Sequence, residues 1–153
     1  MPKTIMAAID LASSTDQVLA AAKEYSKAFS AKLYLVHVAI PPEMMLISPL
    51  EEDVGLEGVP IPIDREVEAD RLRRDHKAMQ DLGRELSDAG VDVTSIAIEG
   101  SAVEELLEEI ERLGIDLVIM GSHAPSLLEF LVGSTTKGVM HGAHCPVLVL
   151  PPT

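Results

Sequence analysis

The sequence predicts an α/β fold, an open five-stranded parallel sheet with helices on both faces. Five short apolar runs are separated by longer segments in which apolar residues recur at helical spacing. Four of these runs are nearly unbroken Ile, Val, Leu, Ala and Met, which is typical of strands covered on both faces. Because strands and helices alternate over the 153 residues, we expect right-handed crossovers and a single domain over 1–153.

Each apolar run is assigned to one strand. The third run alternates between apolar and polar residues more than the others, as an edge strand does. The predicted strands are Thr4–Ile9, Leu33–Val38, Val91–Ile98, Ile115–Met120 and Val147–Leu150.

Four of the intervening segments predict helices. The first begins at Ser14, whose spacing to Gln17 fits a capping box, and the last runs from about Ser134 to Gly142. The apolar stripes of the first three are Val18, Ala22, Tyr25 and Phe29; Ala69, Leu72, His76, Met79, Leu82 and Leu86; and Val103, Leu106, Leu107, Ile110 and Leu113. The third helix also carries a glutamate-rich face that we expect in solvent, made of Glu104, Glu105, Glu108, Glu109 and Glu111. Residues 39–66, rich in Pro and Gly, predict a long irregular excursion that is either mobile or covers another part of the molecule.

Composition excludes several classes of protein. The formal net charge of −13 argues against non-specific nucleic-acid binding, and four aromatic residues are too few for a base-stacking platform. No run reaches the roughly 18 apolar residues of a membrane span, so we expect no membrane insertion. The single cysteine, Cys145, cannot form an internal disulfide, and the N-terminus lacks the pattern of a signal peptide. We therefore expect a cytoplasmic protein.

The negative charge is concentrated in the middle of the chain. Residues 1–40 sum to +1, residues 41–116 to −14 and residues 117–153 to zero. The neutral last segment is either mostly buried or faces an anionic ligand.

Polar residues lie at the ends of two of the predicted strands, where an open α/β sheet places its ligand site. Asp10 follows the first strand, and its carboxylate can accept hydrogen bonds from a ligand amine or hydroxyl, or cap the next helix. His37 lies near the end of the second strand among apolar neighbours. This setting favours a structural, hydrogen-bonded histidine over a catalytic one.

Two glycine-bearing turns flank the start of the last helix. Gly121-Ser122-His123 ends the fourth strand, and Gly133-Ser134-Thr135 opens the helix. Glycine lets a backbone approach an anion closely, and helix N-termini favour phosphate. The spacing matches neither the GxxxxGK[ST] nor the GxGxxG motif, so the turns are either a phosphate site or two ordinary turns.

Taken together, motifs along the whole chain outside 39–66 resemble those of the universal stress protein (UspA-like) family. The motifs are Ile9-Asp10, Leu35-Val36-His37-Val38, Gly100, Ile115-Asp116-Leu117-Val118-Ile119-Met120-Gly121-Ser122-His123, Gly133-Ser134 and His141-Gly142-Ala143-His144-Cys145-Pro146-Val147-Leu148-Val149-Leu150. The resemblance implies a Rossmann-like sheet of strand order 3-2-1-4-5 and binding of ATP, with Mg²⁺ as a candidate companion ion.

The nucleotide loop departs from the family's pattern. ATP-binding members carry G-x2-G-x9-G-[S/T], whereas here Ala124 replaces the second glycine and Gly121 is one residue closer to Gly133. The loop is similar to that of a subgroup written G-S-H-R-P-S…G-S-N, which includes ATP binders and has the same shorter spacing. Against that subgroup, Ala124 replaces an arginine and Thr135 an asparagine. Without the guanidinium we expect a weaker hold on the phosphates.

The resemblance also implies a role for each matching residue. Asp10 and Val38 would contact the adenine, Met120 and Gly121 the ribose, and Ala8 would face the base. The phosphates would be held by His123, Gly133, Ser134 and Thr135.

The resemblance implies a homodimer through Val147–Leu150; alternatively, the chain's own helices cover this strand. Cys145 is expected to be a packed thiol. The preferred hypothesis is a cytoplasmic, dimeric universal stress protein that binds ATP as a regulator or sensor with an unknown protein partner. It has no assigned catalytic residue, although slow ATP hydrolysis or autophosphorylation is compatible with it. The alternatives are a nucleotide-free interaction module, favoured by Ala124, and an enzyme that uses His123.

Overall fold

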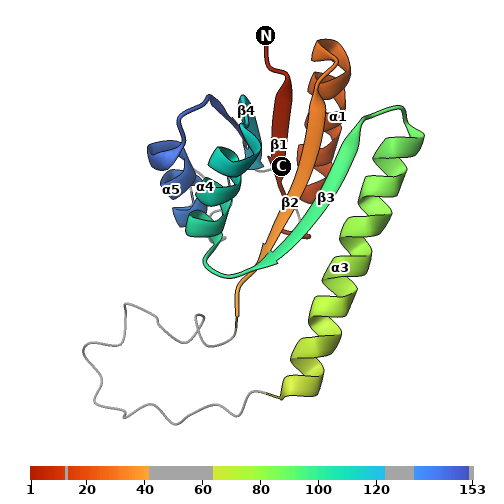
Figure 1. Ribbon diagram of the computed structural model, residues 1–153. Coiled ribbons are helices and arrows are strands. Elements are labelled where there is room, and N and C mark those ends of the chain that lie inside the picture. The colour runs from red at the N-terminus through yellow and green to blue at the C-terminus, as the bar shows by residue number, and fades with distance from the viewer. Residues whose placement is uncertain (13, 42–63, 123–132, 152–153) are drawn as a thin grey trace.

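The five strands form one parallel sheet in the order β3-β2-β1-β4-β5 (Figure 1). This computed structural model describes residues 1–12, 14–41, 64–122 and 133–151. The fold class and the strand order are therefore confirmed. The strands are β1 Thr4–Ala8, β2 Lys32–Ala39, β3 Val93–Glu99, β4 Leu117–Gly121 and β5 Val147–Leu150. The helices are α1 Thr15–Phe29, α3 Arg65–Asp88, α4 Ala102–Leu113 and α5 Ser134–Gly142.

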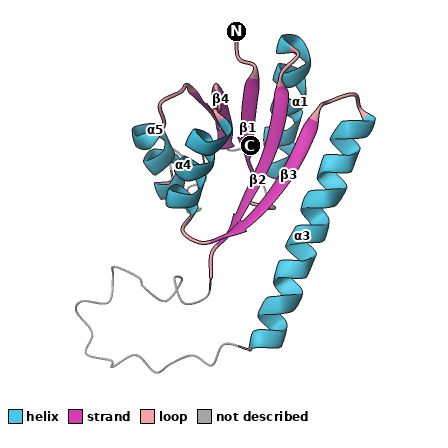
Figure 2. Cartoon of the chain, viewed as in Figure 1, coloured by secondary structure: helices cyan, strands magenta, loops and turns pink. Residues whose placement is uncertain are grey.

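Helices cover both faces of the sheet (Figure 2). Successive side chains of a strand point to opposite faces. On β1, Ile5 and Ala7 therefore pack with Val18 of α1 and Met79 of α3 in one core cluster. Met6 packs on the other side, in a second cluster with residues of α4 and α5. The nearly continuous apolar strands are explained by this two-sided burial.

The expected edge strand is confirmed. β3 lies at the end of the sheet, pairs with β2 and has no fully buried residue, whereas the central strand β1 is buried along Ile5–Ala7. The predicted strand bounds differ from the observed ones by at most two residues.

The predicted excursion 39–66 is too long at both ends. Ala39 is the last residue of β2, and its carbonyl accepts a hydrogen bond from the Gly100 N–H at 3.0 Å. Helix α3 already begins at Arg65 because the Asp64 carboxylate caps it, accepting hydrogen bonds from the two N–H groups that follow Arg65. Residues 42–63 lie outside the described residues, so the expectation of a mobile or covering segment stays a prediction.

The capping box predicted for the first helix is wrong. Ser14 is the N-cap residue, but its side chain makes no capping hydrogen bond. Its hydroxyl instead donates to Asp10 at 3.3 Å. The Ser14 side chain is therefore turned to the preceding carboxylate and does not cap the helix.

The predicted stripe of α3 is wrong at one position. His76 is exposed and contacts Gln80, whereas Asp75 is turned inward and half-buried. In the first half of α3 the inward-facing residues are polar, because this half lies beside the end of the sheet rather than over its middle. No described helix is long and apolar enough to cross a membrane.

The glutamate-rich face of α4 is solvent-exposed at Glu104, Glu108 and Glu111, whereas Glu105 is half-buried. Glu109 is buried and pairs with Arg112 one turn later. The helix ends as predicted at Gly114, whose φ of 62° is in the left-handed region that favours glycine.

Candidate functional site

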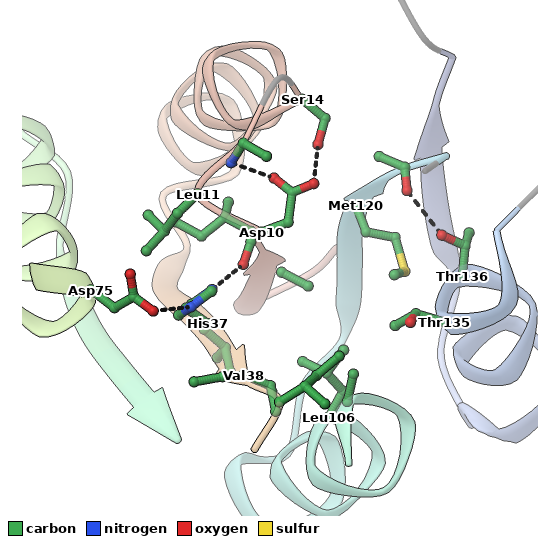
Figure 3. Close-up of a pocket in the computed structure, with 18 of the residues that line it drawn as sticks. Asp10, Leu11, Ser14, His37, Val38, Asp75, Leu106, Met120, Thr135 and Thr136 are labelled. Carbon is green, nitrogen blue, oxygen red and sulfur yellow. Dashed lines mark hydrogen bonds and ion pairs between the residues drawn. The ribbon is translucent and has the colours of Figure 1, made fainter. Parts of the chain in front are cut away.

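A cavity of about 490 Å³ opens at the carboxyl ends of β1, β2 and β4 (Figure 3). Its size is within the range of about 300–1,000 Å³ that is usual for small-molecule sites. β1 and β4 are neighbours in the sheet, and the chain leaves them for helices on opposite faces. The cavity therefore lies where ligands bind in open α/β sheets.

Six of the nine predicted binding residues line this cavity. They are Ala8, Asp10, Val38, Met120, Gly121 and Thr135. Gly133 and Ser134 lie at the start of α5, directly before Thr135, but do not line it themselves. His123 and Ala124 lie outside the described residues. The fold thus gathers residues from four separate parts of the chain, the ends of β1, β2 and β4 and the start of α5.

Asp10 lies at the top of the cavity, and its carboxylate is turned toward the start of α1 (Figure 3). Oδ1 accepts hydrogen bonds from the Ala12 N–H at 2.9 Å and the Thr15 hydroxyl at 3.2 Å, and Oδ2 from the Ser14 hydroxyl. These three bonds tie Asp10 to the turn before α1 and to the hydroxyl of the first helical residue.

The backbone of β2 opens toward the cavity at Val38. Peptide groups of alternate residues point to opposite neighbouring strands. The Val36 carbonyl accepts from Ile9 on the β1 side, and the Ala39 carbonyl accepts from Gly100 on the β3 side. Val38 therefore presents its N–H and carbonyl on the β1 side, beyond the last paired residue of β1.

His37 is structural, as its apolar neighbours predicted. It is only 7% exposed, and its Nδ1 lies 2.9 Å from the Ile9 carbonyl oxygen. Its Nε2 lies 3.3 Å from Asp75 Oδ2 on α3. The ring therefore joins three elements at the edge of the cavity.

Helix α3 contributes a charged wall that sequence reasoning missed. Arg71 and Asp75 are one turn apart and both line the cavity. Arg71 Nη2 donates to the Ile40 carbonyl at 3.0 Å and to Glu68 at 2.7 Å. In the sequence, the polar residues Arg71 and Asp75 lie one helical turn apart beside the apolar stripe of this helix. This spacing was the signal that could have indicated the wall.

The opposite wall combines apolar side chains with hydroxyl groups from α5. The Thr136 hydroxyl, 2% exposed, donates to the Gly121 carbonyl at 2.9 Å and joins α5 to the end of β4. A Cβ on Gly121 would lie 2.9 Å from that of Ser14, so glycine allows β4 and the start of α1 to approach. Leu106 and Ala102 of α4 complete this wall and were not among the predicted site residues.

Among the described residues, no three His, Cys, Asp or Glu side chains are placed to hold a metal ion. A phosphate-bound ion would take part of its coordination from the ligand itself.

The comparisons with known proteins agree on one family. The family model described as the universal stress protein family matches residues 1–151. Universal stress protein A homolog 2 of Coxiella burnetii is 32% identical over 149 residues, which cover 97% of this chain and 94% of that protein. The solved structure of MJ0577, a universal stress protein of Methanocaldococcus jannaschii, superposes with a TM-score of 0.74. It is 27% identical and covers 97% of this chain and 94% of its own.

Two further solved structures of universal stress proteins contain nucleotides. One, described as a complex with cAMP, has a TM-score of 0.67 and 16% identity, with 99% of this chain and 98% of its own covered. The other, from Archaeoglobus fulgidus, is described as a complex with dAMP. Its TM-score is 0.60 and its identity 12%, with 97% of each chain covered. At these identities the likeness is one of fold.

Proposed function

The chain belongs to the universal stress protein family, and from this premise we propose that it binds an adenine nucleotide in the cavity at the carboxyl ends of β1, β2 and β4. The ligand we assign is ATP, with Mg²⁺. The observation that carries the proposal is the division of the cavity into an apolar part beside an open strand end and a hydroxyl-bearing part at a helix N-terminus. The nucleotide complexes of related proteins support a nucleotide over other small molecules.

The apolar part of the cavity suits a purine base. Ala8, Val38, Leu106 and Met120 line it and pack on the core cluster between the sheet and α4. The adjacent N–H and carbonyl of Val38 match the N1 acceptor and the N6 amine of adenine. Guanine offers the reverse pattern on that edge, so adenine is the preferred base.

The other part suits phosphates. Thr135 lines the cavity within the first turn of α5, where free backbone N–H groups favour anions. Residues 1–40 and 117–153, which supply most of the cavity lining, together carry a net charge of about +1, although the whole chain carries −13. Arg71 and Asp75, which line it from α3, add charges of opposite sign. Mg²⁺ bound to the phosphates would further reduce repulsion. A small anion is therefore compatible with an acidic protein.

Released nucleotide and titration test the proposal. The purified chain is denatured and its supernatant analysed for nucleotide, and the native chain is titrated with ATP, with and without Mg²⁺, and with GTP. We expect ATP to bind more tightly than GTP, with a Kd below about 1 mM, which corresponds to about −4 kcal/mol. No released nucleotide together with a weaker Kd overturns the proposal and favours the nucleotide-free interaction module.

A matched pair of variants locates the site. Ala102→Trp places an indole in the cavity, where Ala102 is half-buried, and should weaken ATP binding at least tenfold. Ala28→Trp makes the same change at an exposed position near the far end of α1 and should leave the affinity unchanged. Equal affinities in the two variants would place the nucleotide elsewhere.

We further propose a cytoplasmic regulator or sensor in the stress response, not a metabolic enzyme. Several polar groups at the cavity are engaged in structural hydrogen bonds: Asp10 with Thr15 of α1, His37 with Ile9 and Asp75, and Thr136 with Gly121. Such an arrangement suits holding a ligand more than activating a nucleophile. ATP turnover by the purified chain within the time of a stress response would contradict this role.

Strand β5 supports the proposal of a homodimer. Val147–Leu150 is the last strand on its side of the sheet, pairs with β4 and is half-buried along its whole length. An edge of this kind is a template for pairing with a second copy. Sedimentation equilibrium should give twice the chain mass, and Val149→Lys should shift the chain toward monomer. Val67→Lys, at an exposed apolar position on α3, is the control.

A further inference from the structure

His37 and Asp75 form a hydrogen-bond relay that runs from α3 through β2 to the end of β1. Asp75 Oδ2 lies 3.3 Å from His37 Nε2, and His37 Nδ1 lies 2.9 Å from the Ile9 carbonyl oxygen. Ile9 directly precedes Asp10, which lines the cavity. Figure 3 shows the relay at the side of the cavity opposite Thr135 and Thr136.

Both ring nitrogens of His37 face hydrogen-bond acceptors. A carbonyl oxygen only accepts, so Nδ1 must carry a proton to bond to Ile9. An ionised carboxylate also only accepts, so a second proton must lie between Nε2 and Asp75. The ring is therefore held from both sides, where it is 7% exposed.

The relay determines what lies free at the end of β2. Were the parallel ladder to continue, the Ile9 carbonyl would accept the Val38 N–H as its next bond. In the structure this carbonyl is taken by the His37 ring instead. The peptide group of Val38 is thus left open on the cavity side, where the proposed base edge lies.

We propose that His37 and Asp75 are positioning residues for the nucleotide: Asp75 orients the His37 ring, and His37 holds the Ile9 carbonyl away from Val38. This inference rests on the proposed function. It makes base recognition dependent on the attachment of α3.

Other charged groups share the space around the ring. Asp10 follows β1, and Arg71 is one turn before Asp75 on α3, both lining the same cavity. On the other side of His37, a groove between α3 and β3 contains Arg73, His76 and Glu99. Asp75 is the group in hydrogen-bond contact with the ring, so its substitution is the direct test.

Adenosine is the probe, because it carries the base without the phosphates. Asp75→Ala removes the second contact of the ring, so adenosine affinity of the full chain should fall at least fivefold. Asp81→Ala, at an exposed acid on the same helix, is the matched control and should leave the affinity unchanged. Unchanged affinity in a folded Asp75→Ala variant overturns the role of Asp75.

Removing the ring tests the second half of the relay. His37→Leu frees the Ile9 carbonyl to bond to Val38, and adenosine affinity should fall at least tenfold. Unchanged affinity in a folded His37→Leu variant overturns the positioning role.

A measurement without ligand separates this inference from the proposed function. In ¹⁵N spectra of the free protein, we expect Nδ1 of His37 to carry a proton, as its hydrogen bond to the Ile9 carbonyl requires. A ring protonated at Nε2 alone overturns the relay whether or not a nucleotide binds. Failure of adenosine to bind to a chain with the expected spectrum overturns the proposed function instead.

Discussion

The two ends of the sheet use similar carboxylates for different purposes. At the amino end, Asp116 Oδ2 accepts hydrogen bonds from the N–H groups of Lys3 and Thr4 at 2.8 and 3.0 Å, closing the gap between β1 and β4. At the carboxyl end, Asp10 accepts from the first residues of α1 and leaves the same gap open as a cavity. A carboxylate that joins two strands seals the sheet, whereas one that turns the chain into a helix makes room for a ligand.

This contrast separates stability from binding. Substitutions at the amino end should change the free energy of unfolding and leave nucleotide affinity alone. Substitutions at the carboxyl end should change affinity, and should change stability only where the side chain also belongs to the core.

Leu106→Ala should have the largest effect, because Leu106 belongs both to the core and to the cavity wall. It is 4% exposed in the core cluster of the α4 face and also lines the cavity. Truncating a buried leucine costs about 2–5 kcal/mol of unfolding free energy. Denaturant unfolding should show this loss, and ATP titration should show weaker binding. A loss well below 1 kcal/mol would mean that this wall is not part of the core.

Thr136→Val should have a smaller effect at the same end. The change keeps the shape of the buried side chain but removes its hydrogen bond to the Gly121 carbonyl. We expect a loss of about 1 kcal/mol in unfolding free energy. Thr135→Val, which removes a hydroxyl that lines the cavity, is the companion variant and should change ATP affinity more than stability.

Asp116→Asn tests the amino end through pH. Hydrogen bonds from the backbone of Lys3, then from the backbone and hydroxyl of Thr4, hold the pKa of Asp116 below its ordinary value. A depressed pKa in the folded state means that the stabilisation is present above the unfolded pKa and lost as pH falls through the folded one. The native chain should therefore lose stability below about pH 4, and the variant should lose less. ATP affinity at neutral pH should not change; a change would break the proposed separation of the two ends.

The smallest expected effect is on the reactivity of the Cys145 thiol, which belongs to the amino end of the sheet. Burial raises its pKa, and the charge of Asp116 raises it further, so little thiolate forms at neutral pH. A disulfide reagent should therefore react with it more slowly than with a free thiol. Asp116→Asn should increase this rate modestly. A rate as fast as that of a free thiol would contradict the expected packed cysteine.

Much of the fold was predictable because it follows from local patterns. Nearly continuous apolar runs identified four strands, and the alternation of the remaining run identified β3 as an edge. The end of α4 was predictable from a glycine, and the start of α5 from the hydroxyl-bearing residues after Gly133. The start of α3 was not, because the Asp64 cap is one acidic residue among many in that part of the chain.

The two walls of the cavity also differed in how far the sequence predicted them. The residues of the α5 side lie in motifs that resemble a known family, so Met120, Gly121 and Thr135 could be named in advance. Arg71 and Asp75 could not, because their place depends on where a long helix passes the sheet end. The error at His76 has the same cause: a shift of one residue in helical phase decides which side chain turns inward.

The class of fold and the end of the sheet at which a ligand site would lie were predictable from the sequence, because burial on two faces and chain alternation are local properties. The family was predictable from its motifs. The bonds of Asp10 to the turn before α1, and the place of His37 between Ile9 and Asp75, depend instead on the tertiary structure. Those contacts join residues as far as 38 positions apart. The periodicity of the sequence does not indicate such a contact, because the contact forms only when the strands and helices have packed.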